Sequence, residues 1–216
     1  MKIYHGSNKI IDKPLYRGSS STNDYGPAFY VTEDLYQAKI WACKNKEIGI
    51  VNTYDFDLSK YKILDLSDSN KYSILNWVAI LLHYRKVSDS ISKTYKSVLD
   101  WLEDNYYIDI SKYDVVIGYR ADDAYYKFPI AFLTGSLSIN RLEQIYKAGN
   151  LGLQIVLISK KAIDGLTFVN SISPEKYFLD LNEKITLEAK HTFDALLELP
   201  IDINEQNVFD LMRGHK

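Results

Sequence analysis

The sequence predicts one α+β domain, because short strand-like and helix-like segments alternate along its 216 residues and no linker rich in proline or glycine divides them. Hydrophobic residues make up 46% of the chain, which is enough to build a core at this length. Strands are marked by apolar residues at every second position and helices by a spacing of three or four. We therefore expect 1–216 to form a single domain.

Alternating apolar and polar residues, separated by turn-forming Gly, Ser, Asn and Asp, predict the strands. The first two contain KIYHG and PAFYVT, and a turn-rich loop lies between them. Further strands are expected at IVNTYDFDL, KILDL, YDVVIGY and LQIVLISKKA.

Helical spacing predicts a helix at EDLYQAKIWACKN, with Thr32 as its cap, and another at SLSINRLEQIYKAGNLG, ended by Gly149. Between about 70 and 105, two apolar faces with the same spacing predict a helical insertion between strands. The region 171–216 mixes strand and helix signals, so we expect a C-terminal extension there without assigning its structure.

Charge and composition exclude several classes of protein. The net charge is −2 and the pI is about 6.1, so there is no global basic field that would favour nucleic acid. The single cysteine, Cys43, excludes an intrachain disulfide, and the longest apolar run, WVAILL, is too short to cross a bilayer. The sequence thus predicts a cytoplasmic protein that does not associate with membranes.

Four motifs follow one another in the chain: YHGS, then DYGPAFYVT with a helix containing QAKIWA, then GYRADDAYY, and then LGLQIVLIS. Together they resemble a bacterial family of ADP-ribosyltransferase-like domains, often described as toxins of toxin–antitoxin pairs. Their order is that of the diphtheria-toxin and poly-ADP-ribose-polymerase class. The resemblance covers roughly residues 1–170. It implies a split, mainly antiparallel β core with surrounding helices, and NAD in the cleft between the two half-sheets.

The resemblance assigns roles in NAD binding to His5, Gly6 and Tyr30. His5 is expected to form a hydrogen bond with a hydroxyl of the adenosine-side ribose, Gly6 to let the backbone approach the carboxamide, and the Tyr30 ring to stack on the nicotinamide. Ala28 stands where that family usually has a second glycine. From the residues alone, His5 also fits a hydrogen-bonded core histidine, and Tyr30 fits an aromatic of a strand core.

Gln154 stands where the resembled class has a catalytic glutamate. Cleavage of the bond between nicotinamide and ribose passes through an oxocarbenium-like state, which a negative charge stabilises and a neutral amide does not. Asp122 and Asp123, which follow the strand YDVVIGY, are candidates for that charge. Alternatively, Asp122 caps a helix beginning near Ala124 and pairs with Arg120.

Arg120 and Arg17 are candidates for binding the pyrophosphate of NAD, because a guanidinium group fits phosphate oxygens. The alternative for Arg17 is a solvated residue of a polar loop. No Rossmann glycine motif, no P-loop and no histidine with metal-ligand spacing is present, so NAD is expected as a co-substrate without a metal.

These expectations define the predicted function. The chain is expected to be a mono-ADP-ribosyltransferase that modifies an intracellular protein or nucleic acid, and a toxin with a cognate antitoxin protein as partner. One alternative is a catalytically lapsed module that binds NAD, ADP-ribose or a partner protein. Another is an NAD glycohydrolase, in which water is the acceptor.

Overall fold

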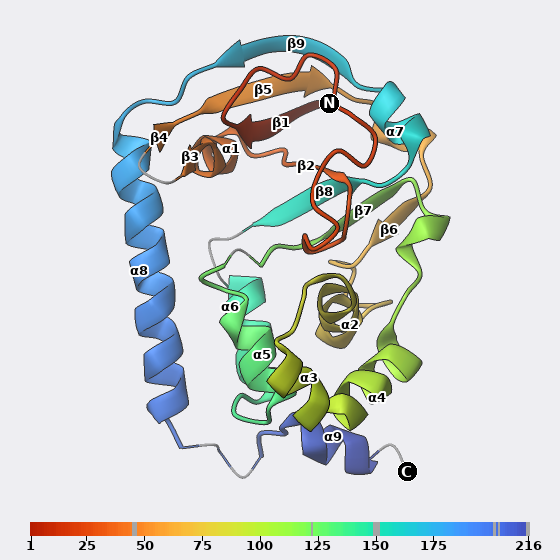
Figure 1. Cartoon of the computed structure of the whole chain (residues 1–216), viewed down its shortest axis with the longest axis vertical. Helices are drawn as coiled ribbons and strands as arrows, with labels where there is room; N and C mark the ends of the chain where they lie inside the picture. Colours follow the sequence, from red (N-terminus) through yellow and green to blue (C-terminus); the bar gives the residue numbers. More distant parts are fainter. Residues whose placement is uncertain (45–46, 122, 149–151, 201, 203, 215–216) are drawn as a thin grey trace.

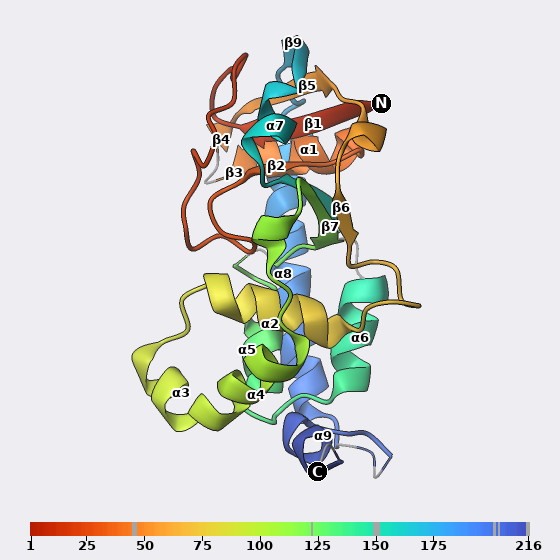
Figure 2. The same ribbon diagram turned by 90° about the vertical axis from the view of Figure 1, so that its right-hand side faces the viewer.

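The structure is a computed structural model that describes residues 1–44, 47–121, 123–148, 152–200, 202 and 204–214. It confirms the α+β class: two sheets occupy one end of the molecule and a group of helices occupies the other (Figures 1 and 2). A long helix runs along one side and connects the two ends (Figure 1).

The first sheet has the strand order β1-β5-β9, with antiparallel pairing throughout. Its strands are β1 (Lys2–Ser7), β5 (Ile50–Asp55) and β9 (Thr167–Ile172). The pairing of β5 with β9 shifts register between Thr53 and Tyr54. The strand β9 was not assigned from the sequence, because its residues are mostly exposed and form no regular apolar face.

The second sheet has the order β2-β8-β7-β6, with β6 and β7 parallel and the other pairs antiparallel. Its strands are β2 (Phe29–Val31), β8 (Leu153–Leu157), β7 (Val115–Tyr119) and β6 (Ile63–Asp65). The two sheets meet where β1 passes β2, because the backbone groups of Tyr4 and Thr32 exchange hydrogen bonds of 2.8 and 2.9 Å. A short hairpin of β3 (Cys43–Lys44) and β4 (Glu47–Ile48) follows the first helix.

The first helix, α1 (Leu35–Ala42), begins later than expected, and the prediction that Thr32 caps it is wrong. The carboxylate of Asp34 accepts the backbone N–H groups of Tyr36 and Gln37, at 2.8 and 3.3 Å. Thr32 is still part of the bridge to Tyr4, and its hydroxyl accepts the N–H of Asp34 instead. The cap therefore lies two residues further on, where the chain has left the sheet.

The helical insertion near 70–105 is confirmed, with a short third helix between the two expected ones. It consists of α2 (Ile74–Tyr84), α3 (Asp89–Thr94) and α4 (Lys96–Tyr106). Two 3₁₀ turns, Leu58–Lys60 and Ile110–Lys112, precede β6 and β7. The expected helix at 136–149 is α6 (Ile139–Ala148), and its predicted end at Gly149 lies outside the described residues.

The strand predicted at 153–162 is wrong in its second half, because β8 ends at Leu157 and α7 (Lys160–Asp164) follows. The hydroxyl of Ser159 accepts the N–H of Ala162 at 3.0 Å, which caps the new helix. The helix expected from Ala124 begins at Lys127 as α5 (Lys127–Leu133).

The C-terminal region contains α8 (Tyr177–Glu198) and α9 (Val208–Gly214). Near the sheets, the side-chain amide of Asn182 donates to the carbonyl of Ile40 at 3.2 Å. At the other end, the Arg141 guanidinium donates to the carbonyl of Leu196 in the last turn of α8 and to those of Leu199 and Pro200 directly after it. The long helix is thus attached to both ends of the molecule (Figure 1).

The two largest apolar clusters of the described residues hold these parts together. One lies between the sheets and includes Ile3, Val31, Tyr54, Val115, Ile155 and Leu157. The larger one packs α2, α4, α5 and α6 against the second sheet, with Trp77 of α2 fully buried in it. Among the helices of the described residues, none combines the length and the apolar character that a membrane span requires.

Candidate functional site

A cavity of about 260 Å³ lies where the two sheets meet, and it brings together most of the predicted site residues. The predicted site residues that line it are His5, Gly6, Tyr30, Arg120, Asp123 and Gln154. It also contains residues that the sequence did not single out: Asn23, Asp24, Trp41, Lys44, Arg85 and Ala121. A second cavity of about 420 Å³, formed largely by the loop 9–19, shares His5 and Tyr30 with the first.

His5 of β1 is tied to β2, because its Nδ1 lies 2.6 Å from the carbonyl oxygen of Tyr30. A carbonyl only accepts, so Nδ1 has the proton and donates. Burial lowers the pKa of His5, against the effect of that hydrogen bond, so the ring is neutral at pH 7. In this tautomer Nε2 is an acceptor, which suits a ligand hydroxyl. The ring also packs on Phe29, with centroids 4.4 Å apart.

The Tyr30 ring is fixed by its own hydroxyl. The O–H donates to the Gly26 carbonyl at 2.6 Å and accepts the N–H of Tyr25 at 3.2 Å. Gly26 has a φ of +72°, a left-handed conformation that glycine adopts without strain. Ala28 does not have a positive φ, and its methyl group is buried in the larger core. The alanine therefore causes no backbone strain.

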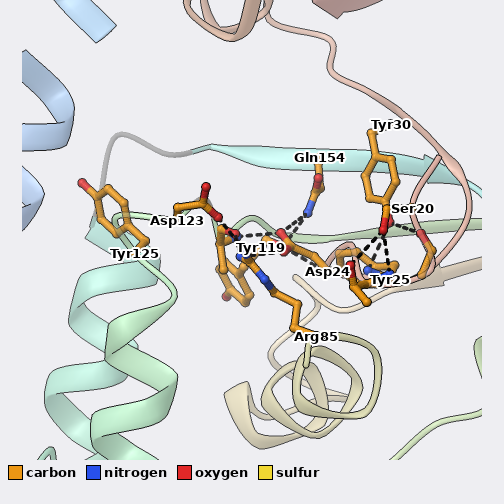
Figure 3. A network of polar contacts seen from close by, with 12 residues as sticks. Ser20, Asp24, Tyr25, Tyr30, Arg85, Tyr119, Asp123, Tyr125 and Gln154 are labelled. Carbon is orange, nitrogen blue, oxygen red and sulfur yellow. Dashed lines mark hydrogen bonds and ion pairs between the residues drawn. The ribbon is translucent and has the colours of Figure 1, made fainter. Parts of the chain in front are cut away.

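Gln154 of β8 is buried, and its amide orientation is set by two acceptors. Its Nε2 donates to Asp24 Oδ2 at 3.3 Å and to the Tyr119 carbonyl at 3.1 Å. The same carbonyl also accepts from the Tyr25 hydroxyl and the Trp77 indole, at 2.9 and 3.0 Å. Since both amide hydrogens are used in this way, Oε1 is the atom with which Gln154 can accept a hydrogen bond from a ligand (Figure 3).

Asp24 is the buried carboxylate of the cavity, and it lies between Arg85 and Gln154 (Figure 3). Its Oδ2 accepts the N–H of Ala121 at 2.8 Å, and its Oδ1 lies 3.3 Å from Arg85 Nη1. Burial raises the pKa of Asp24, whereas the Ala121 amide, the Arg85 charge and the Gln154 amide oppose that rise. Arg85 also donates to the Ala121 carbonyl, and its guanidinium lies 4.2 Å from the Tyr126 ring centroid.

The two predicted carboxylates are placed differently. Asp123 lies at the mouth of the cavity, where its side chain is 99% exposed and pairs with Arg85 Nη2 at 2.6 Å. Asp122 lies outside the described residues, so its predicted catalytic and capping roles stay predictions.

The two predicted arginines also differ. The Arg120 guanidinium lies 4.3 Å from the ring centroid of Trp41, on the cavity wall. Arg17 is exposed in the loop before β2, with a φ of +54°, and is not among the residues that line the cavity. Its assignment to the pyrophosphate is therefore not supported, and the solvated alternative fits better. Across the described residues, no group of three or more His, Cys, Asp or Glu is placed to hold a metal ion.

One family model matches residues 1–168, and its description is "Protein of unknown function (DUF3990)". The chain belongs to this family. No curated protein matches the chain, and no solved structure matches it. The matched region of the DUF3990 family contains every residue that lines the cavity, whereas α8 and α9 lie beyond it.

The sequence reasoning missed Asp24 and Arg85. Asp24 lies in the segment NDYG, where an aspartate is equally typical of an exposed turn. Arg85 directly follows α2, where a basic residue is typical of a solvated helix end. Their pairing joins residues 61 positions apart, which no local pattern indicates.

Gly6 is needed for packing, and this differs from the role expected for it. A Cβ at this position would lie 2.5 Å from the Ala38 carbonyl oxygen and 2.6 Å from the Ala42 nitrogen. Both atoms belong to the backbone of α1, so they cannot rotate away. The absent side chain lets β1 lie directly against α1.

The first prediction follows from this contact. Gly6→Ala should lower the free energy of unfolding by about 1–3 kcal/mol, because the added methyl group forces β1 and α1 apart. Urea denaturation measures the effect. Gly214→Ala is the matched control, because a Cβ there has no atom within 4 Å and should not destabilise the fold. Equal loss in both variants, or none in either, would contradict the packing role.

Proposed function

We propose that the chain is a mono-ADP-ribosyltransferase that uses NAD to modify an intracellular macromolecule. One observation supports this most: His5 of β1, Tyr30 of β2 and Gln154 of β8 lie on the same cavity although they are far apart in sequence. These are the three positions at which the resembled class has its signature residues. We further propose that the two sheets are the split core of that class, with NAD held between them.

The geometry suits the two riboses of NAD. A hydroxyl of the adenosine-side ribose can donate to His5 Nε2, since Nδ1 is committed to the Tyr30 carbonyl. A hydroxyl of the nicotinamide-side ribose can donate to Gln154 Oε1, since Nε2 is committed to Asp24 and Tyr119. Both contacts use atoms whose orientation is already fixed by the protein, so little ordering is required on binding.

The size of the cavities also bears on the fit. A cavity of about 260 Å³ suits the nicotinamide half of NAD but not the whole dinucleotide. The second cavity, about 420 Å³, adjoins it at His5 and Tyr30. We propose that the adenosine half extends into this second cavity, past His5. Arg120, on the wall of the first cavity, is then the candidate to bind the pyrophosphate.

A second candidate function is a binding module that holds NAD or ADP-ribose without chemistry. The observation that favours it is Gln154, whose neutral amide stands where the resembled class has a charged carboxylate and donates hydrogen bonds to Asp24 and Tyr119. This candidate predicts NAD binding without release of nicotinamide.

The test is the fate of NAD labelled separately in its nicotinamide and adenylate parts, incubated with the protein and a cell lysate. The proposed activity releases labelled nicotinamide and transfers adenylate label to protein or nucleic acid. Free ADP-ribose as the only product would identify a glycohydrolase. Binding without any release of nicotinamide would identify the binding module, and neither binding nor release would contradict the proposal.

The resemblance also suggests a toxin that a cognate antitoxin protein holds inactive, and we propose this role for the chain. Inducing the chain alone in a bacterium is then expected to arrest growth. Tyr30→Ala, which removes the ring proposed to stack on nicotinamide, should relieve the arrest while the protein still accumulates. Normal growth with full accumulation of the unaltered chain would contradict the toxin role.

A further inference from the structure

The proposed reaction needs a negative charge that Gln154 does not supply. Two described carboxylates line the cavity, those of Asp24 and Asp123. Their surroundings differ sharply, because the Asp123 side chain is 99% exposed and the Asp24 side chain is 11% exposed. Water and salt screen an exposed charge, whereas a buried charge acts through a medium of low dielectric constant.

Both oxygens of the Asp24 carboxylate accept hydrogen bonds from the protein. The Ala121 N–H and the Gln154 amide donate to Oδ2, and Arg85 pairs with Oδ1. These donors oppose the rise in the pKa of Asp24 that burial causes, and they restrict rotation of the carboxylate. A group fixed in this way does not have to reorganise when positive charge develops nearby, which is the condition for effective electrostatic catalysis.

Gln154 lies between the Asp24 carboxylate and the proposed position of the ribose. Gln154 Nε2 faces Asp24 at 3.3 Å, and Gln154 Oε1 is the atom proposed to accept a ribose hydroxyl. The carboxylate is therefore one side chain away from the reacting ribose. Its charge polarises the amide toward the ribose, so that the hydrogen bond strengthens as the sugar becomes positive.

We infer that Asp24, and not Asp123, provides the negative charge that stabilises the oxocarbenium-like state, acting through and beside Gln154. This inference rests on the proposed function. In the step, the bond between ribose C1′ and the nicotinamide nitrogen breaks, and its electron pair leaves with nicotinamide, which becomes neutral. The acceptor forms the new bond to C1′ and loses its proton to water. Asp24 exchanges no atom and no electron, so it is a positioning and electrostatic residue.

The experiment compares NAD affinity and the rate constant of nicotinamide release at saturating NAD. Asp24→Asn keeps the size of the side chain and an acceptor for the Ala121 N–H but removes the charge. It should lower the rate constant roughly 100-fold while changing NAD affinity little, because the charge is needed mainly in the transition state. The unfolding midpoint of each variant is measured in the same preparations.

Asp114→Asn is the matched control. Asp114 directly precedes β7, whereas Asp24 contacts Ala121, which follows the other end of this strand. Like Asp24, Asp114 accepts a backbone N–H, that of Lys62 at 3.0 Å. It also lies 3.7 Å from a cation, Lys161. A purely structural loss of charge should therefore affect both variants alike, and the inference predicts a loss of turnover in Asp24→Asn alone.

A second variant provides a readout that a structural role would not change. Asp24→Ser opens space beside Gln154, and added formate should restore part of its turnover, whereas chloride at the same ionic strength should not. Full turnover in Asp24→Asn, or loss in Asp123→Asn instead, would overturn the inference. If the unaltered chain neither binds NAD nor releases nicotinamide, the proposed function fails, and that result is distinguishable from failure of Asp24 alone.

Discussion

Gln154→Glu is expected to destabilise the folded chain by about 3 kcal/mol or more at pH 7, because the new carboxylate meets buried acceptors. Gln154 Nε2 now donates to Asp24 Oδ2 and to the Tyr119 carbonyl. A glutamate oxygen in that place would face another carboxylate and a carbonyl with no hydrogen between them. In the resembled class a glutamate stands at this position, so the change would restore the negative charge found there. The hydrogen bonds around Gln154 nevertheless predict a loss of stability.

The loss of stability in Gln154→Glu should depend on pH. Two carboxylates so close share a proton, so the pKa of the pair is raised in the folded chain above that of the unfolded carboxyl groups. The folded state then binds protons more tightly than the unfolded state. The deficit in stability should therefore be largest above the raised pKa and should shrink as the pH falls through it.

Gln154→Met is the control, because it removes the amide without adding charge. The Tyr119 carbonyl still accepts hydrogen bonds from the Tyr25 hydroxyl and the Trp77 indole, so the free energy of unfolding should fall by only about 1–2 kcal/mol. Urea denaturation at pH 7 and pH 5 measures both variants. A Glu variant as stable as the Met variant at pH 7, with no gain at pH 5, would show that the network described at Asp24 is not formed.

Arg85→Met is expected to have an effect of similar size, a loss of about 3–5 kcal/mol, because it leaves Asp24 buried without its cation. Arg85 also donates to the Ala121 carbonyl and lies over the Tyr126 ring, so the methionine loses those contacts as well. Thermal or urea denaturation measures the loss.

A double-mutant cycle separates the ion pair from the other contacts of Arg85. If the unpaired charge is the main cost, Arg85→Met combined with Asp24→Asn should be more stable than Arg85→Met alone. Asp123→Asn removes only the exposed partner and should leave the free energy of unfolding nearly unchanged. Additive losses in the double variant would contradict coupling between Arg85 and Asp24.

The sequence predicted the strands that position His5, Tyr30 and Gln154, because half-buried strands show apolar alternation. The apolar periodicity of α2 and α4 likewise predicted the helical insertion. The sequence did not predict β9 or α8. The strand β9 is mostly exposed and lacks the apolar alternation of the other strands. The apolar residues of α8 do recur at helical spacing, as at Phe178, Leu181, Ile185 and Ala189, but strand-like signals in the same region left it unassigned.

The side chains that join distant segments were harder to predict than the strands. The place of Asp24 beside Ala121 and Gln154 depends on contacts 97 and 130 positions apart in the chain, which form only when both sheets are assembled. Gly6 was singled out for its predicted approach to a ligand, and the structure adds a second reason, because its backbone lies directly against that of α1. Local sequence identifies a glycine that matters without indicating which neighbour requires it.

We expect the cavity between the sheets to bind NAD through His5. Calorimetric titration of NAD into the unaltered chain, into His5→Ala and into His83→Ala tests this expectation. His83 is the matched control, because it is a histidine of α2 that pairs with Glu103 away from the cavity. We expect one NAD per chain, roughly tenfold weaker binding in His5→Ala and unchanged binding in His83→Ala. Absence of binding to the unaltered chain, or equal affinity in all three proteins, would contradict it.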